Sequence, residues 1–239
     1  MPSPGGPSAE AFADVARALL AEGDVQQTLQ KIVDLAVDTI DGCEHAGISF
    51  LKSGKGSTPA ASDDVPRSVD LVQYETGEGP CLDAIRESQV FESGDLGREA
   101  RWPQFAARAQ RATGVTSMLC FRLFVEGDTL GALNLYSKAA DAFDERARTV
   151  GLVFAAHAAI ALSTALHDEQ MDEALRSRDL IGQAKGILMA REGVSADEAF
   201  EMLKRASQRL NLKLRDVARS VVDPGSVAPE GGNGDQGGA

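Results

Sequence analysis

The sequence predicts an α+β protein in which a sheet flanked by helices precedes a long helix and a small all-helical unit. Two long apolar runs, residues 117–125 and 129–136, are separated by a short Glu-Gly-Asp turn, which is a strong signal for a β-hairpin. From residue 143 to residue 190 there is no proline, and good helix formers dominate. Two shorter helical patterns follow, over residues 196–210 and 214–222.

The segments before the hairpin carry alternating helix and strand signals. Asp24, with Gln27 three residues later, forms a capping-box-like start for a helix. Pro103 suits the first turn of another helix, because its missing N–H is not needed there. The predicted helices cover 9–22, 25–40, 65–74, 81–87 and 103–112, and the predicted strands cover 45–52, 57–62 and 89–92.

The composition of the chain changes at its ends and again after the hairpin. Residues 1–8 and 223–239 are rich in Pro, Gly and Ser, so we expect both ends to be disordered. Between them we expect an α+β domain over 9–165 and a three-helix domain over 166–222. Ser195 and Glu198 form a capping box that opens the second helix of the latter.

Composition indicates an ordinary soluble protein, with 43% hydrophobic and 25% charged residues. No apolar run reaches the roughly 20 residues of a membrane span, and the first residues lack a signal-peptide pattern, so no membrane association is expected. Cys43, Cys81 and Cys120 show no CxxC spacing, which favours a reducing cytoplasm. The three histidines are scattered, so no metal site or other cofactor is predicted.

The charge of the chain is unevenly distributed. The net charge is −12, yet residues 171–222 hold ten Lys and Arg against eight Asp and Glu. Within residues 204–219 there are six basic residues and one acid, Asp216. A basic end on an acidic body is typical of a polyanion-binding module, although a solvated helix face would look the same.

The stretch GQAKGILM places two glycines, Gly182 and Gly186, inside the long helix with Lys185 between them. Each glycine costs roughly 1 kcal/mol relative to alanine in a helix interior. Residues four apart share one face, so the pair leaves a bare strip of backbone there. Another backbone or a ligand would approach that strip, and a close crossing by the last helix of the chain is the purely structural alternative.

The loop TGEGPC, residues 76–81, is neither a Walker A loop nor a dinucleotide fingerprint. Cys81 would lie in the first turn of a helix, where amide groups and the helix dipole would lower its pKa. The alternative is a small buried residue after a turn. No nucleophile elbow, HExxH motif or convincing carboxylate pair is present, so no enzymatic activity and no catalytic residue are predicted.

Two known families resemble parts of this chain. The motifs AKGILM, SADEAF and NLKLRDVA, in this order, closely resemble the ANTAR domain, an RNA-binding three-helix module of bacterial antiterminators. GEGPCLDAI, RWPQFA and LGALNLYS followed by AFD resemble a GAF domain, a sensory fold with an antiparallel sheet and flanking helices. Their pairing resembles the actinobacterial GAF-ANTAR group.

The resemblance implies a signal-responsive RNA-binding regulator of transcription antitermination. Its ANTAR domain would bind hairpins in nascent transcripts, and its GAF domain would gate this activity by binding a small molecule, with Cys81 as a candidate residue of the sensor pocket. Lys185 would meet phosphate, and Gly186 would permit close approach. The expected RNA-binding residues are Ala184, Lys185, Gly186, Arg191, Lys204, Arg205, Arg209, Asn211, Lys213 and Arg215.

The same residues leave two alternative functions open and predict an assembly state. A DNA-binding regulator would use the last two helices, although the turn at Asn211 is short for a helix-turn-helix. A GAF-type reductase of free methionine sulfoxide would use Cys81 and Cys120, which leaves the basic end unexplained. The long helix, with its semi-polar seam, predicts a homodimer.

Overall fold

The computed structural model describes residues 9–21, 24–52, 55–87, 90–125 and 128–224, and divides the chain into two units that meet between Glu169 and Gln170. The termini predicted to be disordered lie outside the described residues, apart from Asp223 and Pro224. The expected ends at residues 22 and 89, and two of the hairpin-turn residues, also lie outside them. All other predicted helices and strands are present, with ends within two residues of their predicted positions.

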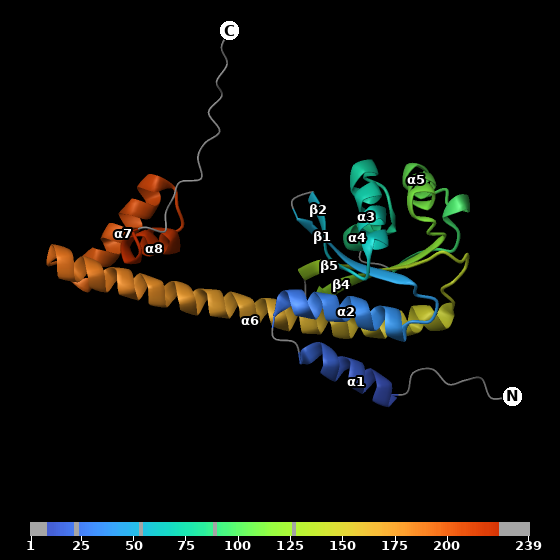
Figure 1. The fold of residues 1–239 in the computed structure, drawn as a ribbon, viewed down its shortest axis with the longest axis horizontal. Coiled ribbons are helices and arrows are strands. Elements are labelled where there is room, and N and C mark those ends of the chain that lie inside the picture. The colour runs from blue at the N-terminus through green and yellow to red at the C-terminus, as the bar shows by residue number, and fades with distance from the viewer. Residues whose placement is uncertain (1–8, 22–23, 53–54, 88–89, 126–127, 225–239) are drawn as a thin grey trace, which may run out of the picture. The chain divides into compact units, whose positions relative to one another are not determined.

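The N-terminal unit is built on a five-stranded sheet with the order β2-β1-β5-β4-β3, in which all neighbouring strands are antiparallel (Figure 1). The predicted hairpin is confirmed as the β4–β5 pair, with Leu119 opposite Leu135. The α+β fold class is also confirmed. The strands are β1 (His45–Lys52), β2 (Lys55–Ala61), β3 (Phe91–Ser93), β4 (Ser117–Val125) and β5 (Asp128–Ser137).

Helices cover both faces of this sheet (Figure 1). One face packs on α2 and the first part of α6, and the other packs on α3, α4 and α5. Strand alternation explains this division: Leu119 and Phe121 of β4 enter the first core, whereas Met118 and Cys120 enter the second. The helices are α1 (Ala9–Leu20), α2 (Val25–Thr39), α3 (Asp64–Thr76), α4 (Pro80–Glu87) and α5 (Pro103–Thr113), with a short 3₁₀ helix at Leu96–Arg98.

The long predicted helix is confirmed as α6, which spans the 48 residues Glu145–Glu192. By length and composition it is also apolar enough to cross a membrane, with a stretch of mean hydropathy 1.8, of which 44% is buried in the protein. The expectation that no apolar run reaches this length is therefore wrong for α6. Its inward residues, such as Phe154, Ala158 and Leu162, are fully buried against the sheet, which accounts for their apolar character.

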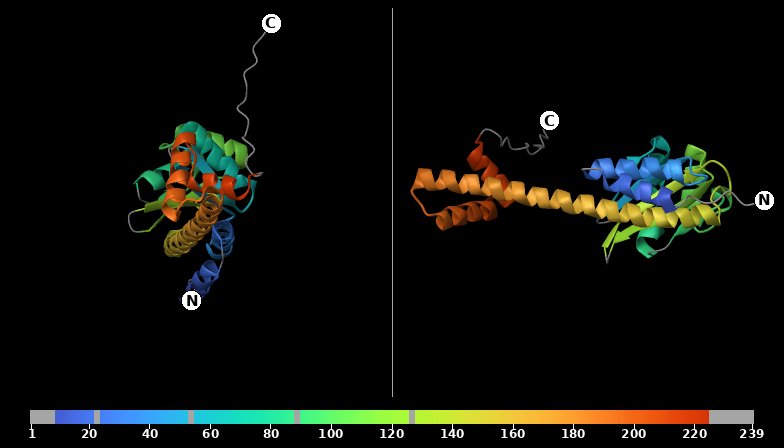
Figure 2. Two further views of the ribbon diagram at one scale, coloured as in Figure 1. Left: turned by 90° about the vertical axis from the view of Figure 1, so that its left-hand side faces the viewer. Right: turned by 90° about the horizontal axis from the view of Figure 1, so that it is seen from below.

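The C-terminal unit consists of the end of α6 with α7 (Ala196–Leu210) and α8 (Leu214–Val222) beside it (Figure 2). The capping box at the start of α7 is confirmed: the Glu198 amide donates to Ser195 Oγ, and the Ser195 amide donates to the Glu198 carboxylate. A small apolar core joins the three helices. Its buried residues are Ala184, Leu203, Val217 and Ala218.

Candidate functional site

Lys185 lies against an aromatic ring on the C-terminal unit. Its Nζ is 5.8 Å from the centroid of the Phe200 ring on α7, within the range of a cation–π contact. The neighbouring Ala184 is fully buried, and this fixes which side of α6 Lys185 occupies. Phe200 is 37% exposed, and Lys204 follows one helical turn later. We call Lys185, Phe200 and Lys204 the cationic–aromatic patch.

Phe200 was not among the residues expected to bind RNA. The sequence alone could have singled it out. Ala199, Leu203 and Ala206 recur at the spacing of the buried side of α7, and Phe200 does not belong to that series. A large apolar residue off the core face of a short amphipathic helix is either incidental or part of an interface. Its contact with Lys185 favours the second interpretation.

Gly182 and Gly186 of α6 are open to solvent. A Cβ atom built on Gly182 or Gly186 meets no atom of the described residues within 4 Å. The alternative in which the last helix crosses them closely is therefore wrong, because α8 packs on the side of α6 that carries Ala184. Within the described chain the bare strip remains free for another molecule.

The basic residues of α7 are divided between two sides of the helix. At about 100° per residue, Arg205 and Arg209 lie between about 100° and about 180° around α7 from Phe200 and Lys204. Both arginines line a cavity of about 540 Å³ between the three helices. The structure therefore brings Lys185 and Lys204 together on one side, and Arg205 and Arg209 together on another.

The remaining expected RNA-binding residues lie near the start of α8 and the end of α6. Arg215 forms ion pairs with Glu173 of α6 and with Asp216, at 3.8 Å for the latter, so its charge is partly neutralised. Asn211 ends α7 in the left-handed conformation, with φ of 51°. Lys213 precedes α8 and is exposed, as is Arg191 in the last turn of α6.

The N-terminal unit contains a buried polar cluster centred on Asp70 of α3. The Asp70 carboxylate accepts hydrogen bonds from Ser49 Oγ, from Thr58 Oγ1 at 2.8 Å and from Tyr136 Oη at 2.9 Å. Gln73 Nε2 donates to it as well, at 3.0 Å. Burial raises the pKa of Asp70, although these donors oppose the shift. Through these hydrogen bonds, one fully buried carboxyl group links β1, β2, α3 and β5.

Cys81 lies beside this cluster and is fully buried. Burial raises the pKa of its thiol to about 12, Asp70 adds to the shift, and hydrogen bonds from Ser49 and Asn134 reduce it. The expected lowering of this pKa is therefore wrong, because the thiol points into the core and not toward solvent at the helix start. Asn134 Oδ1 is buried without a hydrogen-bond partner among the described residues, although Nδ2 donates to Ser49 at 2.7 Å.

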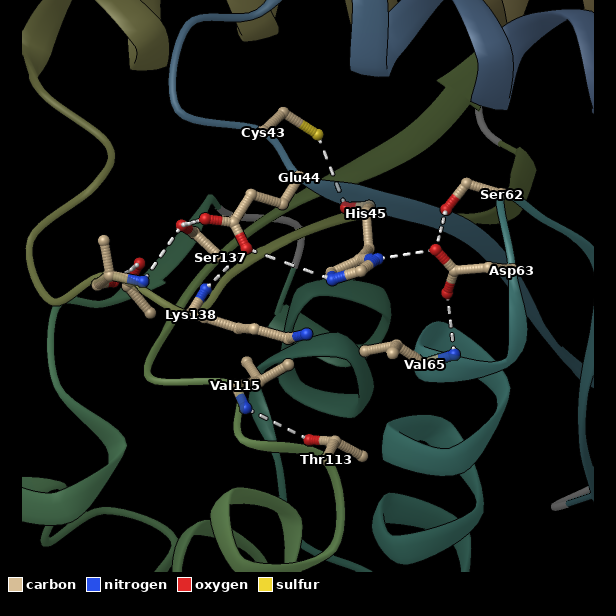
Figure 3. A network of polar contacts seen from close by, with 12 residues as sticks. Cys43, Glu44, His45, Ser62, Asp63, Val65, Thr113, Val115, Ser137 and Lys138 are labelled. Atoms are coloured by element: carbon tan, nitrogen blue, oxygen red, sulfur yellow. Dashed lines mark hydrogen bonds and ion pairs between the residues drawn. The ribbon is translucent and has the colours of Figure 1, made fainter.

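A second polar network lies where β1, β5 and α3 meet (Figure 3). His45 Nδ1 is 2.6 Å from Asp63 Oδ2, and its Nε2 is 4.0 Å from the Glu44 carboxylate. Asp63 also caps α3 by accepting from the Val65 amide. Burial opposes ionisation of Asp63, but the His45 and Val65 hydrogen bonds prevail and lower its pKa. In the described part of the chain, no three side chains of His, Cys, Asp or Glu are grouped to hold a metal ion.

The fold defines a class of protein in which an α+β unit is joined by a long helix to a small helical unit. We call the α+β unit the sensor unit, after the family that it matches. Residues 22–163 match the GAF domain family, and residues 169–222 match the ANTAR domain. The chain therefore belongs to the GAF family and has the GAF-ANTAR architecture, which is that of a regulatory protein.

Solved structures show the same sensor fold. The GAF domain of a phosphoenolpyruvate-protein phosphotransferase from Coxiella burnetii is 14% identical, with a TM-score of 0.52 over 66% of this chain and 94% of that one. Free methionine-R-sulfoxide reductase from Neisseria meningitidis is also 14% identical, with a TM-score of 0.52 over 70% and 99%. At this identity the likeness shows the fold alone. No curated protein sequence matches the chain.

Proposed function

We propose that this protein is a cytoplasmic, signal-responsive regulator that binds hairpins in nascent RNA through its ANTAR domain and so favours antitermination. The observation that carries the proposal is the cationic–aromatic patch on a unit that matches the ANTAR domain. Single-stranded RNA loops expose base faces and phosphates together, and proteins bind them with aromatic rings and cations.

The geometry of the patch fits this chemistry. The half-exposed Phe200 ring offers a face for one unpaired base, and Lys185 beside it offers a charge for the adjoining phosphate. Lys204 forms an exposed ion pair with Glu201 at 3.3 Å, which phosphate would displace at little cost because exposed pairs contribute little. Arg191, Asn211, Lys213 and Arg215 would add contacts at the edges of this interface.

The sensor unit would control binding through a small molecule at the buried polar cluster. Asn134 Oδ1 needs a hydrogen-bond donor there, and the neighbouring Ser49 and Asp70 are polar. A ligand with a donor group would satisfy this oxygen and contact Cys81 alongside it. The same α6 helix packs on the sensor sheet and carries Lys185, so it is the covalent link between the two activities.

A homodimer would cover the outer side of α6. Met171 and Leu175 are 52% and 54% exposed, and Met189 is 39% exposed. With Gly182 and Gly186 they recur at intervals of three, four or seven residues, so all five share one side of the helix. A second α6 would bury these side chains and approach the glycines closely.

Crosslinking followed by sequencing of the bound RNA tests the proposed function in the cell that makes the protein. The proposal predicts that crosslinked reads concentrate at hairpins upstream of terminators in leader transcripts. Reads spread evenly over abundant RNA, or no RNA recovered above an uncrosslinked control, would contradict it.

A further inference from the structure

The cavity on the C-terminal unit is distinct from the cationic–aromatic patch. It has a volume of about 540 Å³, within the range of about 300–1,000 Å³ of small-molecule sites. Apolar side chains from all three helices form most of its wall. The lining residues are Leu188, Met202, Leu203, Arg205, Ala206, Arg209, Val217 and Val221.

Two cations border this apolar cavity without an acidic partner. Among the described residues, neither Arg205 nor Arg209 forms an ion pair, whereas Lys204, Arg215 and Arg219 of the same unit each pair with an acid. The Nε of Arg205 donates to the Glu201 carbonyl at 3.2 Å, which orients its guanidinium and leaves the terminal nitrogens available. Arg205 and Arg209 thus place two guanidinium groups that form no ion pair among the described residues at the edge of one cavity.

The apolar wall and the two adjacent guanidinium groups together indicate what kind of ligand would fit this cavity. The ligand has a flat, weakly polar body for the cavity and an anionic group at its edge. A nucleotide fits this description, because a base enters an apolar pocket or stacks on a guanidinium plane while its phosphate pairs with an arginine. Arg205 and Arg209 are four residues apart on one side of α7, so both reach the same phosphodiester segment.

We propose that this cavity receives one unpaired base of a bound RNA hairpin, and that Arg205 and Arg209 hold the phosphates on either side of that base. The inference rests on the proposed function, since it assigns a second contact of the same RNA. It gives the protein a means of selecting loops over paired stems, because only an unpaired base leaves the stack to enter a pocket.

The test uses the full chain and a hairpin RNA selected for binding to it from a pool with a randomised loop. Each loop nucleotide is replaced in turn by an abasic residue, which keeps every phosphate. Ala206→Phe fills the cavity without changing charge, and Gln208→Phe, at an exposed position of α7 outside the cavity, is the matched control. Arg209→Gln removes one rim charge from an exposed position. Circular dichroism checks that each variant is folded.

We expect one abasic position to weaken wild-type binding about tenfold or more, the magnitude typical of a lost base contact. Ala206→Phe weakens binding to a similar degree and abolishes the sensitivity to that abasic position, while Gln208→Phe does neither. Arg209→Gln lowers the salt dependence by about one ion.

Three results would overturn the inference in distinguishable ways. If Ala206→Phe and wild type bind the selected hairpin equally well, the cavity does not receive a base, although the protein still binds RNA. Binding of an anionic detergent in the cavity, with no effect of Ala206→Phe on RNA, would assign the site to an amphiphile. Failure of the pool to yield any bound hairpin would contradict the proposed function itself.

Discussion

The Nζ atom of Lys185 lies 5.8 Å from the centre of the Phe200 ring, so the lysine of α6 and the phenylalanine of α7 form one surface. Residues from two helices meet there because Ala184 and Leu203 are buried in the core between them. The lysine motif in α6 and the opening of α7 are therefore two parts of a single site, although fifteen positions separate the residues in sequence.

Replacing Phe200 with alanine tests the aromatic half of this surface. We expect Phe200→Ala to weaken hairpin binding by about 1–3 kcal/mol, the range for one stacked base. Phe124 is the matched control, because it is 56% exposed and has the Arg122 guanidinium 5.1 Å from its ring, but belongs to the sensor unit. Fluorescence anisotropy measures both variants. An equal loss for Phe124→Ala would argue against a specific role for Phe200.

Gly186 offers a test of what approaches α6. Gly186→Ala introduces a Cβ that meets nothing in the described chain. Because alanine favours a helix interior over glycine, we expect the free energy of unfolding to rise by about 1 kcal/mol above the wild-type value. Gly193→Ala is the contrast, since Gly193 has φ of +67° and an alanine there is strained. Thermal unfolding followed by circular dichroism gives both values. Gain of stability together with loss of RNA binding or dimerisation would show that the glycine is kept for a partner, whereas a destabilised Gly186→Ala variant would refute the open-strip geometry.

The dimer is tested on the exposed side of α6. Leu175→Glu places a charge on this side, so we expect it to shift the protein from twice the chain mass to the chain mass in light scattering at micromolar concentration. Leu71→Glu is the control, because Leu71 is 56% exposed on the sensor unit and far from the glycines in sequence. A wild-type protein that is monomeric with and without RNA would contradict the proposed pairing.

The lowered pKa of Asp63 makes the stability of the fold depend on pH. Its folded-state pKa is lowered, so its ionised form stabilises the fold above the unfolded pKa of about 3.9, and this contribution is lost as pH falls through the folded value. Asp63→Asn keeps a helix cap but loses the charge beside His45. We expect it to be less stable than wild type at pH 7 and equal to it in strong acid.

Asp63→Ala also loses the hydrogen bond to the Val65 amide, which costs about 1 kcal/mol at every pH. Urea unfolding at a series of pH values separates the two effects. A wild-type advantage over Asp63→Asn that is the same at pH 7 and in acid would contradict the role of the Asp63 charge.

The thiols are expected to be unreactive in the folded protein. Burial raises the pKa of Cys43 and Cys81 to about 12 and that of Cys120 well above its ordinary value, so little thiolate is present at pH 8. We expect a disulfide reagent to modify all three only after addition of denaturant. Rapid modification of Cys81 in the native protein would show that the sensor opens at this cluster.

Local patterns predicted most of the fold. The capping box at Ser195, the hairpin of β4 and β5, and the proline-free run of α6 depend on residues close in sequence, which is why their positions are correct. Which way a side chain faces in the assembled unit depends on distant residues. Cys81 illustrates this, because helix position alone predicted a lowered pKa while packing against β1 and β5 raises it.

The sequence predicts which types of residue form the candidate RNA interface, but only part of how they are arranged. Charge counting marked Lys204, Arg205 and Arg209 alike, yet helical geometry places the two arginines at an apolar cavity and Lys204 beside Phe200. Neither the cavity nor the ion pair of Arg215 with Glu173 follows from a local pattern, since both require residues from separate helices.

The most direct test of the central claim is a competition between a selected hairpin RNA and duplex DNA of the same stem sequence for the full chain, over a range of salt concentrations. We predict that the RNA hairpin wins at every salt concentration. We also predict that Lys185→Ala weakens its binding and lowers the slope of log affinity against log salt by about one. Preference for the duplex DNA, or a Lys185→Ala variant that binds the hairpin as wild type does at matched salt, would contradict the account.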